Sequence, residues 1–230
     1  MYNERLEESD MKRSSNRVRN SSNLALSLAL LLFLSACNQS LTMEAKTDVP
    51  TPLAVKLPLS IGVHYDENFR NYTYEENSED RQNWAIKSGS SQVDLFDRVL
   101  PSMFQDISYI EDISGTLLTN VDGVLVPEVE DMQFALPRET KSDLYEVWIK
   151  YKVSLLDKNG DLVADWPVTG YGKSSTEFLK SRDKGMQAAI NSAFRDAGAR
   201  FALSFSRIPP VRQWLAANPA VCESGTTDIC

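Results

Sequence analysis

The stretch YEVWIKYKVSL, Tyr145–Leu155, carries the clearest secondary-structure signal in the sequence. Its alternate positions from Tyr145 onward are Tyr, Val, Ile, Tyr, Val and Leu, and the positions between them are mostly polar or charged. This period of two predicts a β-strand with one buried face and one solvated face. The segments DKNGD, 157–161, and LVADWPVTGYG, 162–172, follow, so we expect a turn and a second strand that complete a β-hairpin.

Shorter patterns on both sides of this hairpin predict the remaining elements. Leu57–Tyr65 alternates like a first strand, and the segments 107–113 and 123–136 are also predicted strands, with Pro127 at an edge or bulge. An apolar stripe predicts a helix over 92–106, which would begin at Ser90 or Ser91. A longer amphipathic helix is expected over 176–205, and PPVRQWLAA, 209–217, is expected to form a short terminal helix.

The order of these elements indicates an α+β fold. We expect a two-layer sandwich in which two main helices pack on a mostly antiparallel sheet, with the folded body spanning residues 58–215. The chain has 230 residues and is 42% hydrophobic, which is enough to form a core. Its net charge is -8, and no basic cluster lies beyond the first 20 residues, so a nucleic-acid partner is not expected.

An apolar run near the N-terminus has the form of a secretory signal. Leu24–Leu34 is nearly all Leu, Ala and Phe, and it is too short for a helix that spans a bilayer, which needs about 20 residues. Basic residues precede it, and we expect residues 1–36 to be a cleaved signal peptide. The first ten residues are acidic and fit a signal badly, which favours Met11 as the true start.

The run ends in Leu34-Ser35-Ala36-Cys37, which resembles the lipobox of bacterial lipoproteins. The resemblance implies cleavage before Cys37, lipid attachment at Cys37, and a membrane partner reached through this lipid anchor. Asn38, rather than Asp, follows the cysteine, and by the same resemblance the destination is the periplasmic side of the outer membrane. Residues 37–57 would then be the lipidated N-terminus and a flexible tether. The alternative is a secretory signal with a chance cysteine, or a short membrane helix.

The other two cysteines, Cys222 and Cys230, lie in a polar tail, 216–230. In an oxidising compartment such as the periplasm, two thiols in one short segment are expected to form a disulfide. A metal-binding or redox pair is the alternative, and the absence of a nearby histidine or of a CxxC motif disfavours it.

A segment rich in aromatic residues offers a possible binding surface. Aromatic side chains in a loop can stack on sugar rings or anchor a partner protein, and they can equally cover the edge of a small core. The residues are Tyr65, Phe69, Tyr72, Tyr74 and Trp84. Acidic residues between them could supply the carboxylate pair of a glycosidase, although acidic loops are usually only solvated. These are Glu75, Glu76, Glu79 and Asp80.

Three further motifs favour structural interpretations. Asp157–Asp161 lacks the spacing of an EF-hand calcium loop and is expected to be a turn at Asn159-Gly160. His64, the single histidine, has no identifiable catalytic partner and is expected at a surface or structural position. Gly170 and Gly172 are expected in a strand-to-helix turn rather than in a phosphate loop. We therefore expect no cofactor, no metal and no catalytic residue.

The layout of residues 57–205 is similar to that of small periplasmic domains of outer-membrane assembly lipoproteins, which serve lipopolysaccharide or exopolysaccharide export. This resemblance implies a non-enzymatic accessory or binding component of envelope assembly or transport, with an envelope protein as partner. One alternative is a periplasmic hydrolase that acts on envelope glycan through the acidic and aromatic segment. Another is an interaction protein displayed on the cell surface.

Overall fold

The structure is a computed structural model, and it describes residues 41–46, 50–51, 55–76, 83–113, 120–176 and 181–223. The chain divides into two compact units, of which the first comprises residues 1–41 and 77–83. The second unit comprises residues 42–76 and 84–230. This second unit has the predicted α+β fold.

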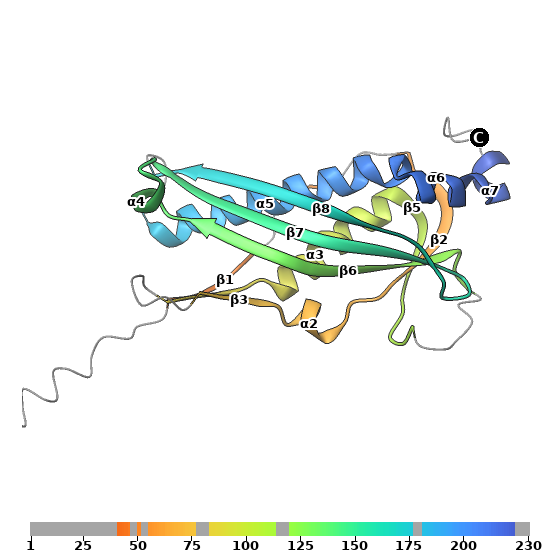
Figure 1. Cartoon of the computed structure of the whole chain (residues 1–230), viewed down its shortest axis with the longest axis horizontal. Helices are drawn as coiled ribbons and strands as arrows, with labels where there is room; N and C mark the ends of the chain where they lie inside the picture. Colours follow the sequence, from red (N-terminus) through yellow and green to blue (C-terminus); the bar gives the residue numbers. More distant parts are fainter. Residues whose placement is uncertain are drawn as a thin grey trace, which may run out of the picture. The chain divides into compact units, whose positions relative to one another are not determined.

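A five-stranded sheet forms the larger layer, in the order β5-β2-β6-β7-β8 (Figure 1). These strands are β2 (Leu57–Val63), β5 (Phe104–Tyr109), β6 (Gly123–Ala135), β7 (Leu144–Asp157) and β8 (Leu162–Ser175). The long strands β6, β7 and β8 are antiparallel, as predicted. In contrast, β2 pairs in parallel with both β5 and β6. These parallel pairs differ from the predicted antiparallel sheet, because they join segments that are far apart in the chain.

The alternation in β7 is confirmed. All six apolar positions of the quoted stretch are buried, and the positions between them are half-buried or exposed. The turn to β8 is also confirmed, with Gly160 at a φ of 85° and the Asp157 carboxylate accepting the N–H groups of Asn159 and Asp161. Pro127 lies in β6 beyond Gly123–Leu125, the residues that pair with β2, so it occupies a local edge beside a bulge, as expected.

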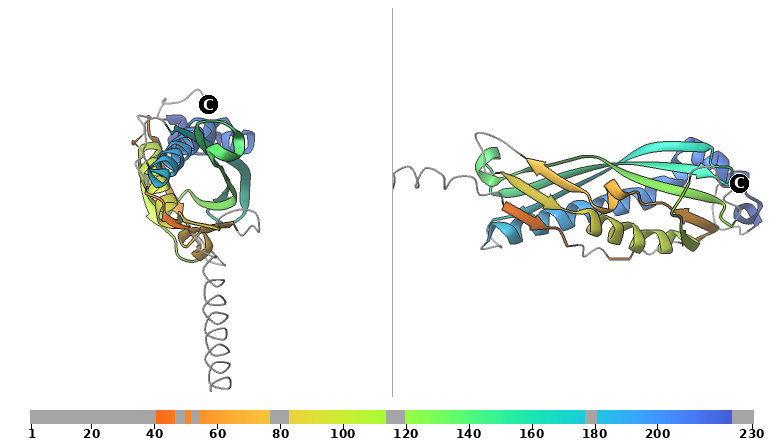
Figure 2. Two further views of the ribbon diagram at one scale, coloured as in Figure 1. Left: turned by 90° about the vertical axis from the view of Figure 1, so that its left-hand side faces the viewer. Right: turned by 90° about the horizontal axis from the view of Figure 1, so that it is seen from below.

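Two main helices cover one face of this sheet, α3 (Gly89–Met103) and α5 (Arg182–Ser204). Figure 2 shows both on the same side of the long strands. Helix α3 starts after Ser88 and ends three residues before the predicted end, because Phe104 is already extended and begins β5. Helix α5 starts later than predicted, since β8 continues to Ser175, and the Ser181 side chain caps it by accepting the N–H of Lys184.

The expectation that Gly170 and Gly172 form a strand-to-helix turn is wrong. Both lie within β8, where α5 packs directly against the strand. A Cβ atom at Gly170 would overlap the backbone oxygen of Ala193, and one at Gly172 would overlap that of Ala189. The glycines therefore allow a close approach of helix and strand, which is a packing role.

A second sheet of three short strands has the order β1-β4-β3. Its strands are β1 (Leu41–Glu44), β3 (Thr73–Glu76) and β4 (Trp84–Lys87), and β3 and β4 pair in an antiparallel manner. Strand β1 lies within the expected flexible tether, and Ala45 after it is buried and bound to Lys87 and Ser91. The tether expectation is therefore wrong for residues 42–46, which are held on the body.

Short helices complete the described chain. They are α2 (Glu67–Arg70), α4 (Pro137–Thr140), the 3₁₀ helix η1 (Phe205–Arg207), α6 (Pro209–Ala216) and α7 (Pro219–Glu223). Helix α6 is the predicted terminal helix, and it has proline in its first turn. Helix α7 lies in the predicted polar tail and buries Val221. Within the described ranges, every helix is too short or too polar to cross a membrane.

Candidate interaction surface

The aromatic segment predicted as a binding surface forms part of the core. Tyr65, Phe69 and Trp84 are buried, and Phe69 is 1% exposed. The Phe69 ring lies 5.8 Å from the ring of Phe96 on α3 and 6.2 Å from that of Tyr151 on β7. The binding-surface prediction is therefore wrong for these three side chains, since the alternative of covering the core accounts for their positions.

The remaining members of this segment are half-buried. Tyr72 and Tyr74 are neither fully covered nor exposed, and the Tyr74 ring contacts that of Phe134 at 5.6 Å. The buried Tyr65 hydroxyl donates to Asp97 at 2.8 Å. Burial, and next the negative charge of Asp97, raise the pKa of Tyr65 far above its usual value, so this phenol stays neutral. These contacts hold the segment in place on the core.

Within the described residues, the carboxylates suggested for a glycosidase site do not form a pair on one face. Glu75 and Glu76 are successive residues of β3, opposite Ala85 and Trp84, and successive side chains of a strand point to opposite faces. Glu79 and Asp80 lie outside the described residues.

An exposed face remains on β6, β7 and β8, on the side away from α5. We call it the outer face, and its residues form rows across the three strands. At one end of this face, Val124 is buried in a small cluster with Val121 and Val126, and the partly buried Leu156 packs against it. Towards the other end, Gln133, Trp148 and Tyr171 form a row. Between them are ion pairs, from Lys150 to Glu130 at 2.9 Å and from Lys152 to Glu128 at 3.0 Å.

Trp148 and Tyr171 form an aromatic pair on this outer face. Trp148 is 40% exposed, and its ring lies 5.2 Å from that of Tyr171 at an angle of 36°. The Tyr171 hydroxyl donates to Oε1 of Glu146 at 2.6 Å, and this bond raises the pKa of Tyr171. The pair is thus fixed in orientation while an aromatic surface stays open to solvent, which is typical of residues that anchor a partner.

The alternation of the strand places Trp148 on its solvated side but does not identify the pair with Tyr171. The two residues are 23 positions apart, and they meet because the hairpin register places Trp148 directly opposite Tyr171. A signal was present, since a large aromatic residue at a solvated position of an alternating strand is unusual. Counting register back from the Asn159-Gly160 turn could have found its neighbour.

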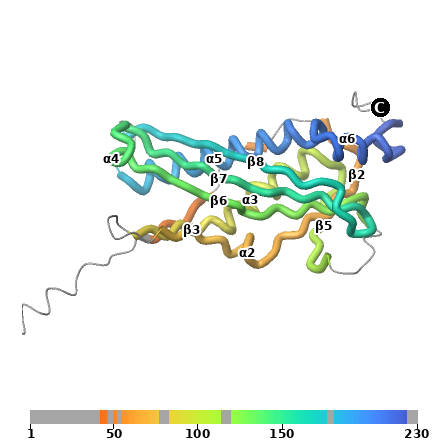
Figure 3. Tube along the Cα trace, in the orientation of Figure 1, coloured from red at the N-terminus to blue at the C-terminus, as the bar shows by residue number. Residues whose placement is uncertain are grey.

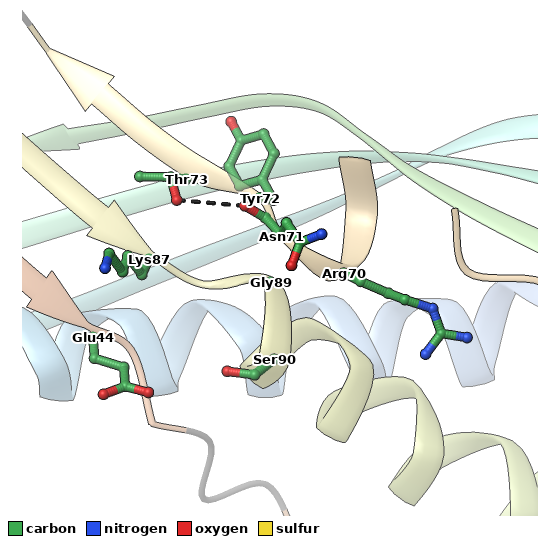
Figure 4. A pocket seen from close by; sticks show the side chains of 8 residues that line it. All are labelled: Glu44, Arg70, Asn71, Tyr72, Thr73, Lys87, Gly89 and Ser90. Atoms are coloured by element: carbon green, nitrogen blue, oxygen red, sulfur yellow. Dashed lines mark hydrogen bonds between the residues drawn. The ribbon is translucent and has the colours of Figure 1, made fainter. Parts of the chain in front are cut away.

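A polar hollow of about 350 Å³ lies beside the small sheet. Figure 4 shows the side chains that line it, and the Arg70 guanidinium and the Glu44 carboxylate lie at its two ends and point apart. The Arg70 Nε–H is bound to the backbone oxygen of Tyr65, and the Gly89 N–H is bound to that of Tyr72. The lining groups do not converge on one point, so this hollow offers no arrangement for chemistry.

The other predicted positions have structural roles or lie outside the described chain. His64 is half-buried, and its Nδ1 atom lies 2.8 Å from the backbone oxygen of Ile110, which agrees with a structural position. Cys222 is disulfide-bonded, while Cys37 and Cys230 lie outside the described residues, so the lipid attachment and the pairing of Cys222 with Cys230 stay predictions. No cluster of metal-ligating side chains is found in the described part of the chain.

Comparison with known proteins gives only distant likenesses. No family model matches the chain, and no curated protein matches it. A Xanthomonas campestris protein of the DUF330 family is 13% identical over 76% of this chain and 98% of its own, with a TM-score of 0.45. A Caulobacter crescentus protein, classed provisionally as a lipoprotein, is 13% identical over 69% and 93%, with a TM-score of 0.39.

A third solved structure is a Helicobacter pylori protein, classed provisionally as a homolog of a neuraminyllactose-binding haemagglutinin. It is 11% identical over 79% of this chain and 100% of its own, with a TM-score of 0.41. At these identities and TM-scores, none of the three likenesses supports an argument about function.

Proposed function

We propose that the protein is a bacterial lipoprotein, held by lipid on Cys37 at the periplasmic side of the outer membrane. In this proposal it is a non-enzymatic accessory or binding subunit of envelope assembly or transport. The basic segment, the apolar run and the Leu34–Cys37 motif support the anchor, and Asn38 supports the outer-membrane destination.

The exposed aromatic pair is the observation on which the binding role rests. Trp and Tyr supply large contact areas at low entropic cost, and they are enriched among the residues that dominate binding energy. Trp148 and Tyr171 occupy a face that α5 and α3 do not cover, and charged rows lie beside them. A face that carries an exposed aromatic pair beside charges of both signs fits a folded protein with a complementary charge pattern. An envelope protein is therefore the proposed partner.

Site-specific crosslinking tests this proposal. A photoreactive amino acid replaces Gln133, which lies directly opposite Trp148, in cells that make the lipoprotein from its own gene. We expect one prominent adduct with an envelope protein, identified by mass spectrometry, and at least a fivefold loss of that adduct when Trp148→Ala is added. The matched control places the photoreactive group at Lys158 in the β7–β8 turn, where no specific adduct is expected. Equal adducts with and without Trp148 would contradict the binding role.

The anchor is tested separately. The intact mass of the mature protein should correspond to a chain that begins at Cys37 and carries lipid. A Cys37→Ser variant should leave the membrane fraction. An unmodified Cys37 thiol, or a retained leader, would contradict the lipid anchor. Either result would leave the crosslinking test unaffected.

The alternative function is a periplasmic hydrolase of envelope glycan. It is the weaker proposal, because Glu75 and Glu76 point to opposite faces of β3. A hydrolase would release soluble fragments from isolated envelope glycan, and Glu75→Gln or Glu76→Gln would abolish that release.

A further inference from the structure

A second hollow, of about 300 Å³, lies where the end of α5 passes the edge strand β8. Figures 1 and 3 show β8 and α5 side by side. The hollow is lined by Pro167, Val168 and Thr169 of β8, Leu203 and Ser204 of α5, and two arginines, Arg200 and Arg207. No carboxylate is among the described lining residues. This hollow shares no lining residue with the aromatic pair on the outer face.

The two arginines give the hollow a local positive charge in a chain whose net charge is -8. Arg200 donates from Nε to Asp196 at 2.9 Å, and its side chain remains 60% exposed. This leaves the Nη groups of Arg200 for a ligand. Arg207 is exposed and makes no ion pair with the described residues. Two guanidinium groups beside one hollow supply several N–H donors of the kind that bind phosphate, which arginine can bind in a bidentate manner.

The backbone of β8 adds a further donor. The N–H of Tyr171 donates to Oδ2 of Asp196 at 3.0 Å, so it points away from β7 and towards the edge of the sheet. In an antiparallel pair, residues two positions apart direct their backbone groups to the same side. The N–H and the carbonyl of Thr169 therefore face the edge that the hollow occupies. This places one more donor beside the arginines, and an acceptor for a ligand hydroxyl.

An exposed apolar side chain borders these donors. Leu203 is 65% exposed, which is unusual for a leucine beside a packed helix–strand contact, and Pro167 is a second apolar residue of the lining. A free inorganic anion would gain nothing from Leu203. An amphiphile would bury it, since an anionic headgroup could reach the arginines while its acyl chain covers the leucine.

We propose that this hollow binds the headgroup of an anionic phospholipid, with Arg200, Arg207 and the Thr169 N–H on the phosphate and Leu203 against the first part of the acyl chain. The inference goes beyond the proposed function, and it rests on that function only in the sense that a lipid anchor keeps the body within reach of lipid. The overall negative charge does not prevent this binding, because charges beyond about 8–10 Å are screened at physiological ionic strength.

Native mass spectrometry of the mature lipoprotein in neutral detergent tests the proposal. Short-chain phosphatidylglycerol, short-chain phosphatidylcholine and inorganic phosphate are titrated separately. We expect one phosphatidylglycerol per chain, bound at least tenfold more tightly than either of the other two probes. The double variant Arg200→Gln and Arg207→Gln should lose at least tenfold in phosphatidylglycerol affinity.

A matched pair, Lys184→Gln and Arg195→Gln, removes the same charge from other positions of α5 and should change the affinity by less than twofold. Leu203→Gln should weaken phosphatidylglycerol binding at least threefold. Equal losses in the two double variants would show a nonspecific charge effect and overturn the site. Inorganic phosphate binding as tightly as phosphatidylglycerol, with no effect of Leu203→Gln, would overturn the lipid as occupant. The Gln133 crosslink involves none of these residues, so either proposal can fail without the other.

Discussion

Tyr151 and Trp148 are three residues apart on β7, yet they belong to opposite faces of the sheet. Tyr151 is 0% exposed and its ring contacts those of Phe69 and Phe96, from α2 and α3. Trp148 is 40% exposed and contacts its neighbour across the hairpin, Tyr171. The same strand thus carries a ring whose surroundings come from distant segments, and a ring whose partner is fixed by local register.

This difference indicates that the inner face contributes mainly to stability and the outer face mainly to binding. The inner face is covered by helices, so its side chains have exchanged water for close packing and contribute to the free energy of unfolding. The outer face keeps its charged rows and its aromatic pair in water, where they contribute little to folding and remain available to a partner. Substitutions on the two faces should therefore have very different effects on stability.

The largest effect is expected at the centre of the inner face. Phe201 of α5 is buried among the rings of Phe96, Trp166 and Phe205. Phe201→Ala should lower the free energy of unfolding by about 3–5 kcal/mol, because it removes buried surface and leaves a cavity. Urea unfolding followed by circular dichroism measures this. The exposed Leu162 is the control, and Leu162→Ala should change little; comparable losses at both positions would contradict the division between the faces.

A smaller loss is expected where α5 meets β8. Gly172→Ala introduces a Cβ that overlaps the backbone oxygen of Ala189, so helix and strand must separate. We expect a loss of about 1–3 kcal/mol in the same unfolding experiment. Lys173→Ala, one residue along the strand and exposed, should be nearly neutral. A stable Gly172→Ala variant would show that close approach of α5 is not required here.

The third prediction concerns the pH dependence of the inner face. Burial raises the pKa of Tyr151 well above its usual value, because the phenolate cannot be solvated there. The stability that depends on neutral Tyr151 is complete below the unfolded pKa of about 10 and is lost as the pH rises above it, by up to about 1.4 kcal/mol per pH unit. Tyr151→Phe should reduce this alkaline loss.

At pH 7, Tyr151→Phe should change the free energy of unfolding only a little. The Tyr151 hydroxyl is buried without a hydrogen-bond partner among the described residues, so its removal ends an unfavourable desolvation. Unfolding measured at pH 7 and at pH 11 checks both statements. Identical alkaline slopes in the parent and the variant would contradict the assignment to Tyr151.

The smallest effect is expected at the outer face. Trp148→Ala removes a cross-strand aromatic contact and should lower stability by only about 0.2–1 kcal/mol, although it should reduce the Gln133 crosslink at least fivefold. Trp166→Ala, a tryptophan of the inner face of β8, is the matched control and should cost several times more. A loss above about 3 kcal/mol for Trp148→Ala would place Trp148 in the core rather than in a binding surface.

Much of the local structure follows from sequence patterns. The strand at 145–155, the turn at Asn159-Gly160 and both main helices were predictable, because alternation, turn chemistry and amphipathic spacing act over a few residues. The parallel pairs of β2 and the binding of residues 42–46 were not predictable. They depend on which distant segment lies alongside, and an apolar pattern contains no information about that choice.

For the candidate sites, the sequence could identify residue types but not their neighbours. Phe69 and Trp84 lie in a polar segment and suggested an exposed surface, yet α3, β6 and β7 cover them. Trp148 lies beside Tyr171 only because β7 pairs with β8. Arg200 and Thr169 line one hollow only because α5 packs beside β8. The sequence identifies these residue types, but the fold makes them candidate binding residues. Such pairs are difficult to recognise in the sequence, because their members are far apart in the chain.

The amino-acid sequence by itself determined the period of the strands and helices, the position of the turn, the acidity of the chain and the motif that predicts a lipid on Cys37. The tertiary structure decided which aromatic rings are buried, which face of β6–β7–β8 stays in water and which arginines share a hollow. The physical reason is that periodicity and turn chemistry act between neighbours in the chain, whereas burial and local charge depend on which side chains pack together in space.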